Sequence, residues 1–222
     1  MKHLLIVLFL AVSTSLFAQM KNVILADKPV PKPTNRDSEV EAWDSTQTIY
    51  QKLNATGKDF FYWINFSRQN PKRFWDTVVQ PTLNAFPTLN SSYSESLKSD
   101  LYHQPTLPLL KLNNTLMQTA SAHAADICSH HAQPGHLSTD GRTFTDRIKA
   151  AGIKVCGGEN ISLGDVDPLL SLVLLYIDYG IPTLGHRKAL LNPDYLETGI
   201  GVGNYGSDGT LFIVQDFACN QQ

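Results

Sequence analysis

Four side chains of the sequence combine chemical reactivity with a position in or beside a glycine-rich turn: His136, Glu159, Asp178 and His186. Such turns let the backbone approach a bound molecule and let side chains point into a cleft. Two imidazoles and two carboxylates could hold a divalent cation such as zinc, perform general acid/base chemistry, or brace one another. We expect the three segments that carry them, residues 134–142, 156–162 and 175–203, to converge on a single pocket.

The spacing of these residues does not decide among the three alternatives. His136 and Glu159 are 23 residues apart, and Asp178 and His186 are 8 apart, which matches no local metal-binding motif. Histidine and glutamate side chains in one cleft are structural networks about as often as they are ligands. His123 lies on a predicted helix, where a packed histidine is more common than a site residue.

No side chain near these residues has the sequence context of an activated nucleophile. Ser138 and Ser162 do not lie in a strand–turn–helix elbow, which argues against a serine hydrolase. Cys156 lies close to Glu159, but in an exported chain a disulfide is the more common state of a cysteine.

The three cysteines allow three pairings, which the sequence leaves open. We favour Cys156 with Cys219, because the first precedes a predicted core strand and the second ends the last strand. Cys128 would then be a buried or free thiol. The cysteine spacing matches no common zinc motif.

The elements that must position these side chains are helices first, then strands with helices between them. Residues 58–69 are rich in aromatic side chains and predict a buried helix. An amphipathic helix capped by Asn113 or Asn114 follows, and an apolar helix begins at residue 167. Residues 198–218 predict an antiparallel hairpin around a glycine turn. This order favours an α+β layered domain over a doubly wound parallel sheet.

Two shorter helices are also predicted from their end signals. Thr143 and Asp146 have the spacing of a capping box, in front of a short helix. Asn70 and Pro71 suit the cap and first position of another helix, which we expect Pro81 to stop.

The first 18 residues predict a secretory signal peptide. They have a basic start, a short apolar run and a small residue before the expected cleavage site, and the run is too short for a membrane span. Residues 19–44 are polar and contain several prolines, which indicates an extended linker. Residues 45–222 are then expected to form one domain. The chain is predicted to be secreted or periplasmic, with no membrane anchor after cleavage.

The charge of the chain argues against one class of partner. Removing Lys2 from the 18 basic residues leaves 17 against 20 acidic residues, a net charge of −3, with no block of like charge. Nucleic acids and anionic membrane surfaces recruit basic patches. We therefore expect no nucleic-acid partner.

Several of these segments together resemble a known family. GHLSTDGRTFTDRIKAAG, GENISLGD and IDYGIPTLGHRKALLNPDYLETGIGVG are similar to the motifs of the CAP superfamily of cysteine-rich secretory, antigen 5 and pathogenesis-related proteins (SCP domain), and most similar to its bacterial secreted members. Asn65 and Arg68 resemble residues of the first helix of that family. The resemblance covers roughly residues 58–219.

The resemblance implies an α-β-α sandwich with a central antiparallel sheet and a large open cleft. That cleft carries a tetrad of histidines and acids, sometimes with zinc. Position by position, the resemblance makes His136 and His186 its histidines and the possible metal ligands, and Glu159 its first acid. Asp178, shorter by one methylene than the glutamate of the family, takes the place of the second acid.

Two functions follow as hypotheses. The first is an exported CAP-domain protein that uses its histidine/acid cleft to bind a lipid, a small molecule or a ligand derived from the cell envelope. The second is a metal-assisted, peptidase-like hydrolase that uses the same cleft, with zinc as the candidate cofactor.

Overall fold

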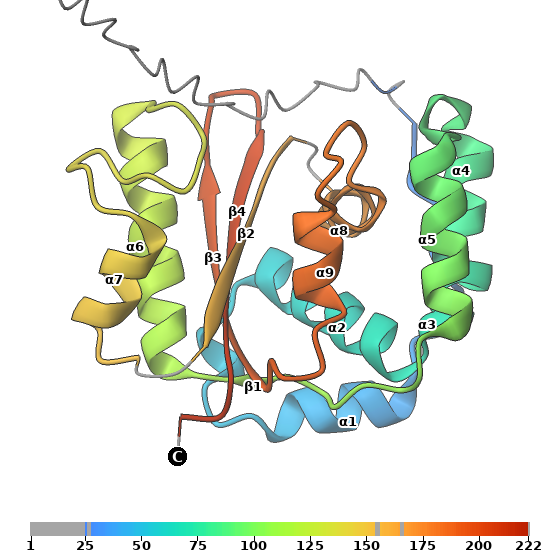
Figure 1. Ribbon diagram of the computed structural model, residues 1–222, viewed down its shortest axis with the longest axis horizontal. Helices are drawn as coiled ribbons and strands as arrows, with labels where there is room; N and C mark the ends of the chain where they lie inside the picture. The colour runs from blue at the N-terminus through green and yellow to red at the C-terminus, as the bar shows by residue number, and fades with distance from the viewer. Residues whose placement is uncertain (1–24, 26–27, 154–155, 165–166, 222) are drawn as a thin grey trace, which may run out of the picture.

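A four-stranded sheet lies between two layers of helices in the computed structural model (Figure 1), which describes residue 25 and residues 28–153, 156–164 and 167–221. The arrangement is the α+β, α-β-α sandwich that was expected. The predicted signal peptide, residues 1–18, and the first part of the predicted linker lie outside the described residues. Within the described part of the chain, no helix is long and apolar enough to cross a membrane.

The sheet has the strand order β1-β3-β4-β2. Strands β3 (Glu197–Asn204) and β4 (Leu211–Ala218) form the predicted hairpin, and β2 (Gly157–Gly164) pairs antiparallel with β4. The expected antiparallel sheet has one exception, because the short strand β1 (Lys111–Leu112) runs parallel to β3. Every residue of the central strand β4 is buried.

Helices α6 (Asn114–His130) and α7 (Phe144–Ala150) cover one face of the sheet (Figure 1). The side chain of Asn113 caps α6 by accepting hydrogen bonds from the backbone of Thr115 and Leu116. Thr143 and Asp146 form the predicted capping box of α7. Both helices therefore begin where the sequence predicts.

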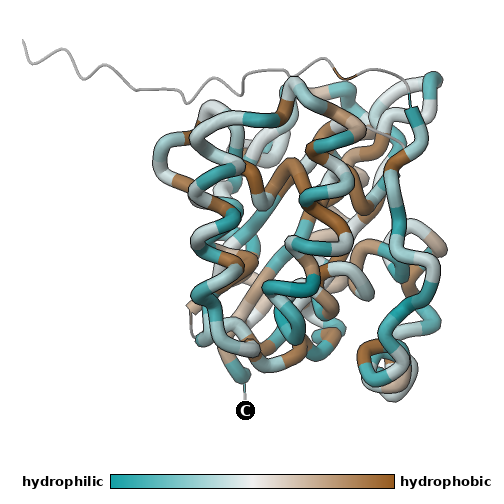
Figure 2. The backbone as a smooth tube through the Cα atoms, turned by 90° about the vertical axis from the view of Figure 1, so that its right-hand side faces the viewer, coloured by the Kyte–Doolittle hydropathy of each residue, from teal (hydrophilic) through white to brown (hydrophobic). Residues whose placement is uncertain are grey.

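The other face carries the main hydrophobic core and the remaining helices. Helix α8 (Pro168–Ile177) is buried on almost all sides, as its continuous apolar sequence predicts. Figure 2 shows this side of the molecule, where hydrophilic and hydrophobic residues alternate along the helices. The helices of this side are α1 (Ser38–Thr46), α2 (Ala55–Gln69), α3 (Pro71–Phe74), α4 (Gln80–Ala85), α5 (Ser92–His103), α8 (Pro168–Ile177) and α9 (Gly185–Leu190).

Pro81 does not stop the helix that Pro71 begins. The chain widens into a π-helical turn at Trp75–Val79 and continues as α4. A proline ring clashes with the carbonyl one turn earlier in a regular α-helix, and a wider turn relieves that clash. The prediction of a stop at Pro81 is therefore wrong.

Strand β3 is glycine-spaced because helix α6 lies directly on it. A Cβ atom built on Gly199 would lie 2.0 Å from the backbone carbon of Leu116, and one on Gly201 would lie 2.2 Å from the carbonyl oxygen of Ala120. No side chain other than hydrogen fits at either position, so the two glycines set the distance between the helix and the sheet.

The chain is already helical before the predicted linker ends at residue 44. Asp37 caps α1, and Val40 and Asp44 of this helix are buried. Asp44 accepts a hydrogen bond from Asn65 of α2 through its Oδ1 atom, at 2.8 Å. This contact across two helices gives the segment an ordered position that its polar composition does not predict.

Asp44 makes the stability of the fold depend on pH. Burial raises the pKa of the Asp44 carboxyl to about 7, although the hydrogen bond from Asn65 partly lowers it. The Oδ2 atom of Asp44 has no hydrogen-bond partner among the described residues. The pKa of Asp44 is higher in the folded state than in the unfolded state. The protonated carboxyl therefore stabilises the fold fully below pH 4, and this contribution is lost as the pH rises through 7.

We expect Asp44→Asn to remove this part of the pH dependence. A carboxyl whose pKa rises from about 4 to about 7 on folding can change the free energy of unfolding by at most about 4 kcal/mol. Urea unfolding at pH 4.5 and pH 7.5 measures the difference. Equal pH dependence in the wild type and the variant would show that Asp44 titrates normally.

A disulfide joins Cys156, just before β2, to Cys219, just after β4, with the two Cα atoms 5.5 Å apart. Of the three possible cysteine pairings, this is the one that we favoured from the sequence. The register of the antiparallel strands places the two residues opposite each other, and the backbone N–H of Cys219 donates to the carbonyl of Cys156. Cys128 is the free cysteine and is partly buried.

Candidate functional site

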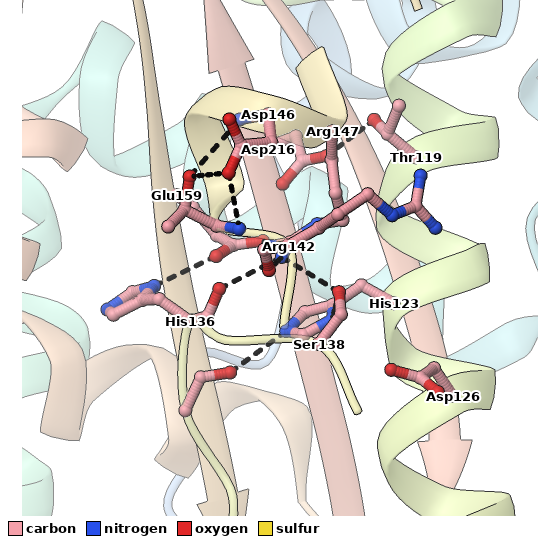
Figure 3. Close-up of polar contacts among 12 residues, drawn as sticks. Thr119, His123, Asp126, His136, Ser138, Arg142, Asp146, Arg147, Glu159 and Asp216 are labelled. Atoms are coloured by element: carbon pink, nitrogen blue, oxygen red, sulfur yellow. Dashed lines mark hydrogen bonds and ion pairs between the residues drawn. The ribbon is translucent and has the colours of Figure 1, made fainter. Parts of the chain in front are cut away.

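His136 and Glu159 form the first half of the site. The Nδ1 atom of His136 lies 2.9 Å from Oε1 of Glu159, which projects from strand β2 (Figure 3). The Glu159 side chain is 1% exposed, whereas that of His136 is 57% exposed. The buried carboxylate thus accepts from Nδ1–H and fixes the orientation of an imidazole that remains open to solvent.

Arg147 of α7 completes this half and was not predicted as a site residue. Its guanidinium donates to Oε2 of Glu159, to the carbonyl oxygen of His136 at 2.9 Å, and to Oγ of Ser138 at 3.1 Å. Burial alone would raise the pKa of Glu159, but the hydrogen bond from His136 and the charge of Arg147 lower it below its usual value. Glu159 is therefore an ionised carboxylate with both oxygen atoms occupied.

His123 supports the same loop from helix α6. Its Nε2–H donates to the carbonyl oxygen of Gly135 at 2.9 Å, and its Nδ1 lies 3.3 Å from Oγ of Ser138. The side chain is 1% exposed, and burial lowers its pKa, which favours the neutral imidazole. His123 is thus a packed histidine, as expected, that holds the residue before His136 in place.

A second buried acid lies beside Glu159. Asp216 is the direct cross-strand partner of Glu159 in the β2–β4 ladder and accepts a hydrogen bond from Thr119. Burial, followed by the nearby charge of Glu159, raises the pKa of Asp216 well above its usual value. The Oδ1 atom of Asp216 is buried and has no hydrogen-bond partner among the described residues. The negative charge of Glu159 therefore disfavours ionisation of Asp216.

His186 and Asp178 form the second half of the site. Asp178 ends helix α8 in a left-handed conformation with φ of 55°, and its side chain is fully buried. Its Oδ1 lies 2.6 Å from Nδ1 of His186, and its Oδ2 accepts from the backbone N–H of Arg187 at 3.0 Å. Asp178 thus orients His186 as Glu159 orients His136.

Both imidazoles line one cleft of about 630 Å³, which lies along strand β2. The three predicted segments all contribute to it, and Glu159 lines it as well. Asp178 does not, because it is buried behind His186. The lining residues are Pro134, Gly135, His136, Gly158, Glu159, Asn160, Ile161, Ile181, Thr183, Gly185, His186, Lys188, Ala189, Asn192 and Tyr195.

Tyr195 contributes an aromatic ring to the lining of the cleft. Its ring stacks on Phe217 with 5.2 Å between centroids, and a Cβ atom on Gly158 would lie 2.5 Å from its hydroxyl oxygen. Gly158 is therefore required for the tyrosine to reach the cleft. Neither Tyr195 nor Arg147 has a sequence signal of its own, because each is brought to the site by packing between elements distant in sequence.

The residues of the cleft do not fit a zinc site with three or four protein ligands. Both oxygen atoms of Glu159 and of Asp178 are already hydrogen-bonded, so only the two Nε2 atoms of His136 and His186 remain as donors. In the described part of the chain, no group of three or more His, Cys, Asp or Glu side chains is placed to hold a metal ion. The acids are better placed to orient the imidazoles than to act as metal ligands.

Replacing Arg147 with methionine is expected to reduce the free energy of unfolding by about 3 kcal/mol near neutral pH, because it removes the charged partner of a buried carboxylate. The lowered pKa of Glu159 means that its stabilising contribution exists above pH 4 and disappears as the pH falls through the folded-state pKa. The difference from the wild type should therefore shrink in acid.

Urea unfolding between pH 3 and pH 7 provides the measurement for Arg147→Met. The matched control is Arg142→Met, because Arg142 is an exposed arginine of the same segment that pairs with Asp140. A pH-independent loss in Arg147→Met would mean that the lost packing, and not the ion pair, is responsible.

A family model matches residues 104–217, just over half of the chain; its description is the cysteine-rich secretory protein family, CAP. A search of curated protein sequences finds no match.

Three solved structures illustrate the structural similarity. An extracellular protein with an SCP domain from Bacillus anthracis is 25% identical over 58% of this chain and 39% of its own, with a TM-score of 0.44. An outer surface protein from Borrelia burgdorferi is 22% identical over 59% of this chain and 90% of its own, with a TM-score of 0.43. The CAP domain of enterococcal PrgA is 11% identical over 92% and 90%, with a TM-score of 0.40. The chain thus spans about two fifths of the Bacillus protein.

Proposed function

This chain belongs to the cysteine-rich secretory protein (CAP) family, and we propose that it is an exported protein, secreted or periplasmic, whose cleft binds a lipid, a small molecule or a ligand from the cell envelope. Export is supported by the predicted signal peptide and by the disulfide between Cys156 and Cys219, a bond that persists in oxidising compartments.

One observation carries the binding proposal. His136 lies in a loop and His186 lies 50 residues further along, in the first turn of α9; each has its Nδ1 atom fixed by a buried carboxylate, and both line the same cleft. Two oriented imidazoles on a rigid support are a preorganised set of hydrogen-bonding groups. The volume of about 630 Å³ suits a small ligand or the head of a larger one.

The lining of the cleft favours a ligand with both polar and apolar parts. Lys188, Asn160 and Asn192 add polar groups to the two imidazoles, while Ile181 and the ring of Tyr195 add apolar surface. Pockets that bind small molecules combine a few polar groups of this kind with apolar walls.

Imidazole NMR spectra of the protein titrated with separate probes would test this proposal. Suitable probes are a lysophospholipid, a free fatty acid and an N-acetylglucosamine oligomer. A ligand of the cleft should shift the ring signals of His136 and His186 and leave those of His103 and His130 unchanged. Both of these are exposed histidines that do not line the cleft.

Variants provide the control for that titration. His136→Ala and His186→Ala should each weaken binding about tenfold or more, because each removes an oriented group, whereas His103→Ala should bind normally. If binding survives in both cleft variants, the ligand site lies elsewhere. If none of the three probes shifts the ring signals of His136 and His186, the proposed ligand classes are wrong.

The alternative of a metal-assisted hydrolase has less support. The carboxylates of Glu159 and Asp178 are each hydrogen-bonded through both oxygen atoms, so the cleft lacks a third metal ligand, and only the Nε2 atoms of His136 and His186 remain to act either as ligands or as a general base. Cleavage of casein by the purified protein, lost in Glu159→Gln, would favour this alternative.

Zinc remains the candidate cofactor for either function. A calorimetric titration with zinc chloride is expected to show weak binding, because only two imidazoles are available as ligands, and His136→Ala and His186→Ala should each abolish it. Tight binding of one zinc per chain would instead support the hydrolase.

A further inference from the structure

The cleft runs along the outer edge of the sheet. Strand β2 is the last in the order β1-β3-β4-β2 and pairs only with β4 among the described strands. Four consecutive residues of β2, from Gly158 to Ile161, line the cleft. A sheet edge presents a row of backbone N–H and C=O groups that can pair with another chain.

The register identifies which groups face outwards. Cys219 N–H donates to the carbonyl oxygen of Cys156, so these two residues form a hydrogen-bonded pair. Such pairs recur at every second residue of an antiparallel ladder, which makes Asn160 with Gln215 another. The backbone groups of the residues on either side of Asn160, namely Glu159 and Ile161, must then point away from β4.

These outward groups have no hydrogen-bond partner among the described residues, and those of Glu159 are also exposed. No described residue makes a hydrogen bond to the backbone N–H or C=O of Glu159 or Ile161 on the cleft side. Glu159 as a whole is partly exposed although its side chain is 1% exposed, so the exposed part is its main chain. The edge is therefore open to the cleft at Glu159, whereas Ile161 is 4% exposed and reaches the cleft only as part of its lining.

The walls of the cleft limit what can pair with this edge. The histidine loop at residues 134–136 stands on one side and residues 181–192 on the other. An added strand lies about 4.8 Å from the edge and rises about 3.3 Å per residue. A single extended segment of a few residues is therefore compatible with a cleft of about 630 Å³, whereas a second sheet is excluded by the walls.

The charges of the lining favour a carboxylate on the occupant. Lys188 is exposed and makes no ion pair with any described residue, and it lies in the same lining as the two imidazoles. Glu159, the only acid of the lining, is compensated by Arg147. Lys188 is therefore the one charged side chain of the lining that no described residue compensates.

We propose that the free edge of β2 binds an extended peptide that carries a carboxylate, an acidic residue or a C-terminus, by adding it as a fifth strand of the sheet. The proposal rests on the proposed binding function and specifies its ligand class. Backbone hydrogen bonds to Glu159 and Ile161 supply most of the affinity, and Lys188 selects the carboxylate.

Amide hydrogen exchange, measured by NMR with a defined probe, tests the strand pairing. The probe is acetyl-Thr-Val-Thr-Val-Asp with a free C-terminus, and its control is the same peptide N-methylated at every residue, which has no backbone N–H group left on either edge to pair with β2. In the free protein the amide of Glu159 should exchange fast, that of the buried Ile161 less fast, and those of Asn160 and Ser162, which bond to β4, slowly. The probe should protect the first two amides at least tenfold, and the N-methylated peptide should not.

A variant tests the carboxylate. Lys188→Met should weaken binding of the probe about three- to fivefold, the effect of one exposed charge pair, while Lys149→Met on α7 should not change it. A C-terminally amidated probe with Asn in place of Asp should bind equally weakly to the wild type and to Lys188→Met.

Several results would overturn the proposal. If the probe binds but does not slow amide exchange at Glu159 and Ile161, the peptide contacts only side chains of the protein. Equally tight binding of the N-methylated peptide would lead to the same conclusion. No binding at millimolar concentration also contradicts it, because strand pairing does not depend on the side chains of the probe. In that case, shifts of His136 and His186 with the lipid or sugar probes would leave the proposed function intact.

Discussion

Gly199→Ala is expected to reduce the free energy of unfolding by at least about 4 kcal/mol. The new Cβ atom would lie 2.0 Å from the backbone carbon of Leu116, 2.2 Å from the backbone nitrogen of Met117 and 2.3 Å from the carbonyl oxygen of Leu116. Overpacking against flexible side chains costs about 1–3 kcal/mol. Here the obstacle is the backbone of helix α6, which can move only as a whole, so the cost should exceed that range.

The measurement is urea unfolding followed by circular dichroism, beside Gly135→Ala. Nothing lies within 4 Å of the Cβ position of Gly135, and its φ angle is not in the left-handed region, so this control should change stability little. A wild-type midpoint for Gly199→Ala would mean that α6 does not rest on β3 as described. If Gly199→Ala is insoluble, Gly201→Ala on the same face should show the same loss relative to the control.

Arg68→Met is expected to have a comparably large effect. The Arg68 side chain is completely buried and donates to the carbonyl oxygens of Pro108, Leu190, Asn192 and Tyr195, at 2.8–3.1 Å. Each buried carbonyl left without a partner costs about 1–3 kcal/mol, so the loss should be at least about 4 kcal/mol. Burial lowers the pKa of the guanidinium to about 10, and it remains charged at neutral pH.

The loss in Arg68→Met should extend to the cleft, because Asn192 and Tyr195 line it. Arg68→Lys keeps a charge but not the planar set of donors, so it should recover only part of the stability. Arg73→Met, at an exposed arginine of α3 that pairs with Asp37, is the matched control and should change little. Thermal unfolding of the three variants separates these cases, and full recovery in Arg68→Lys would show that charge alone matters.

Local signals in the sequence predicted much of the fold. Helix starts depend on the few residues that cap them, so Asn113, Thr143 with Asp146, and Asp167 marked the beginnings of α6, α7 and α8. The glycine turn and the alternating strands marked the β3–β4 hairpin. The π-helical turn before Pro81 and the helix α1 inside the predicted linker were not predicted, because they depend on contacts with distant elements such as the one between Asp44 and Asn65.

The sequence also pointed to the reactive residues of the site. His136, Glu159 and His186 lie in or beside glycine-rich segments of the sequence, and the structure places all three in one cleft. Asp178 was assigned to the same cleft but lies behind His186, because the left-handed end of α8 turns its carboxylate into the protein. Asp178 therefore orients His186 and does not contact the cleft itself. The spacing of residues in a sequence cannot distinguish these two roles.

Only the tertiary structure could supply the partners of those residues. Arg147 meets Glu159 through the packing of α7 on the sheet, and Asp216 meets it through the register of β2 and β4. The same register leaves the backbone of Glu159 free at the edge. The types and local order of residues therefore determined the elements and the candidate chemistry. Distances between elements far apart in the chain determined which charges are compensated and which groups face the cleft, because electrostatic and hydrogen-bond energies depend on those distances.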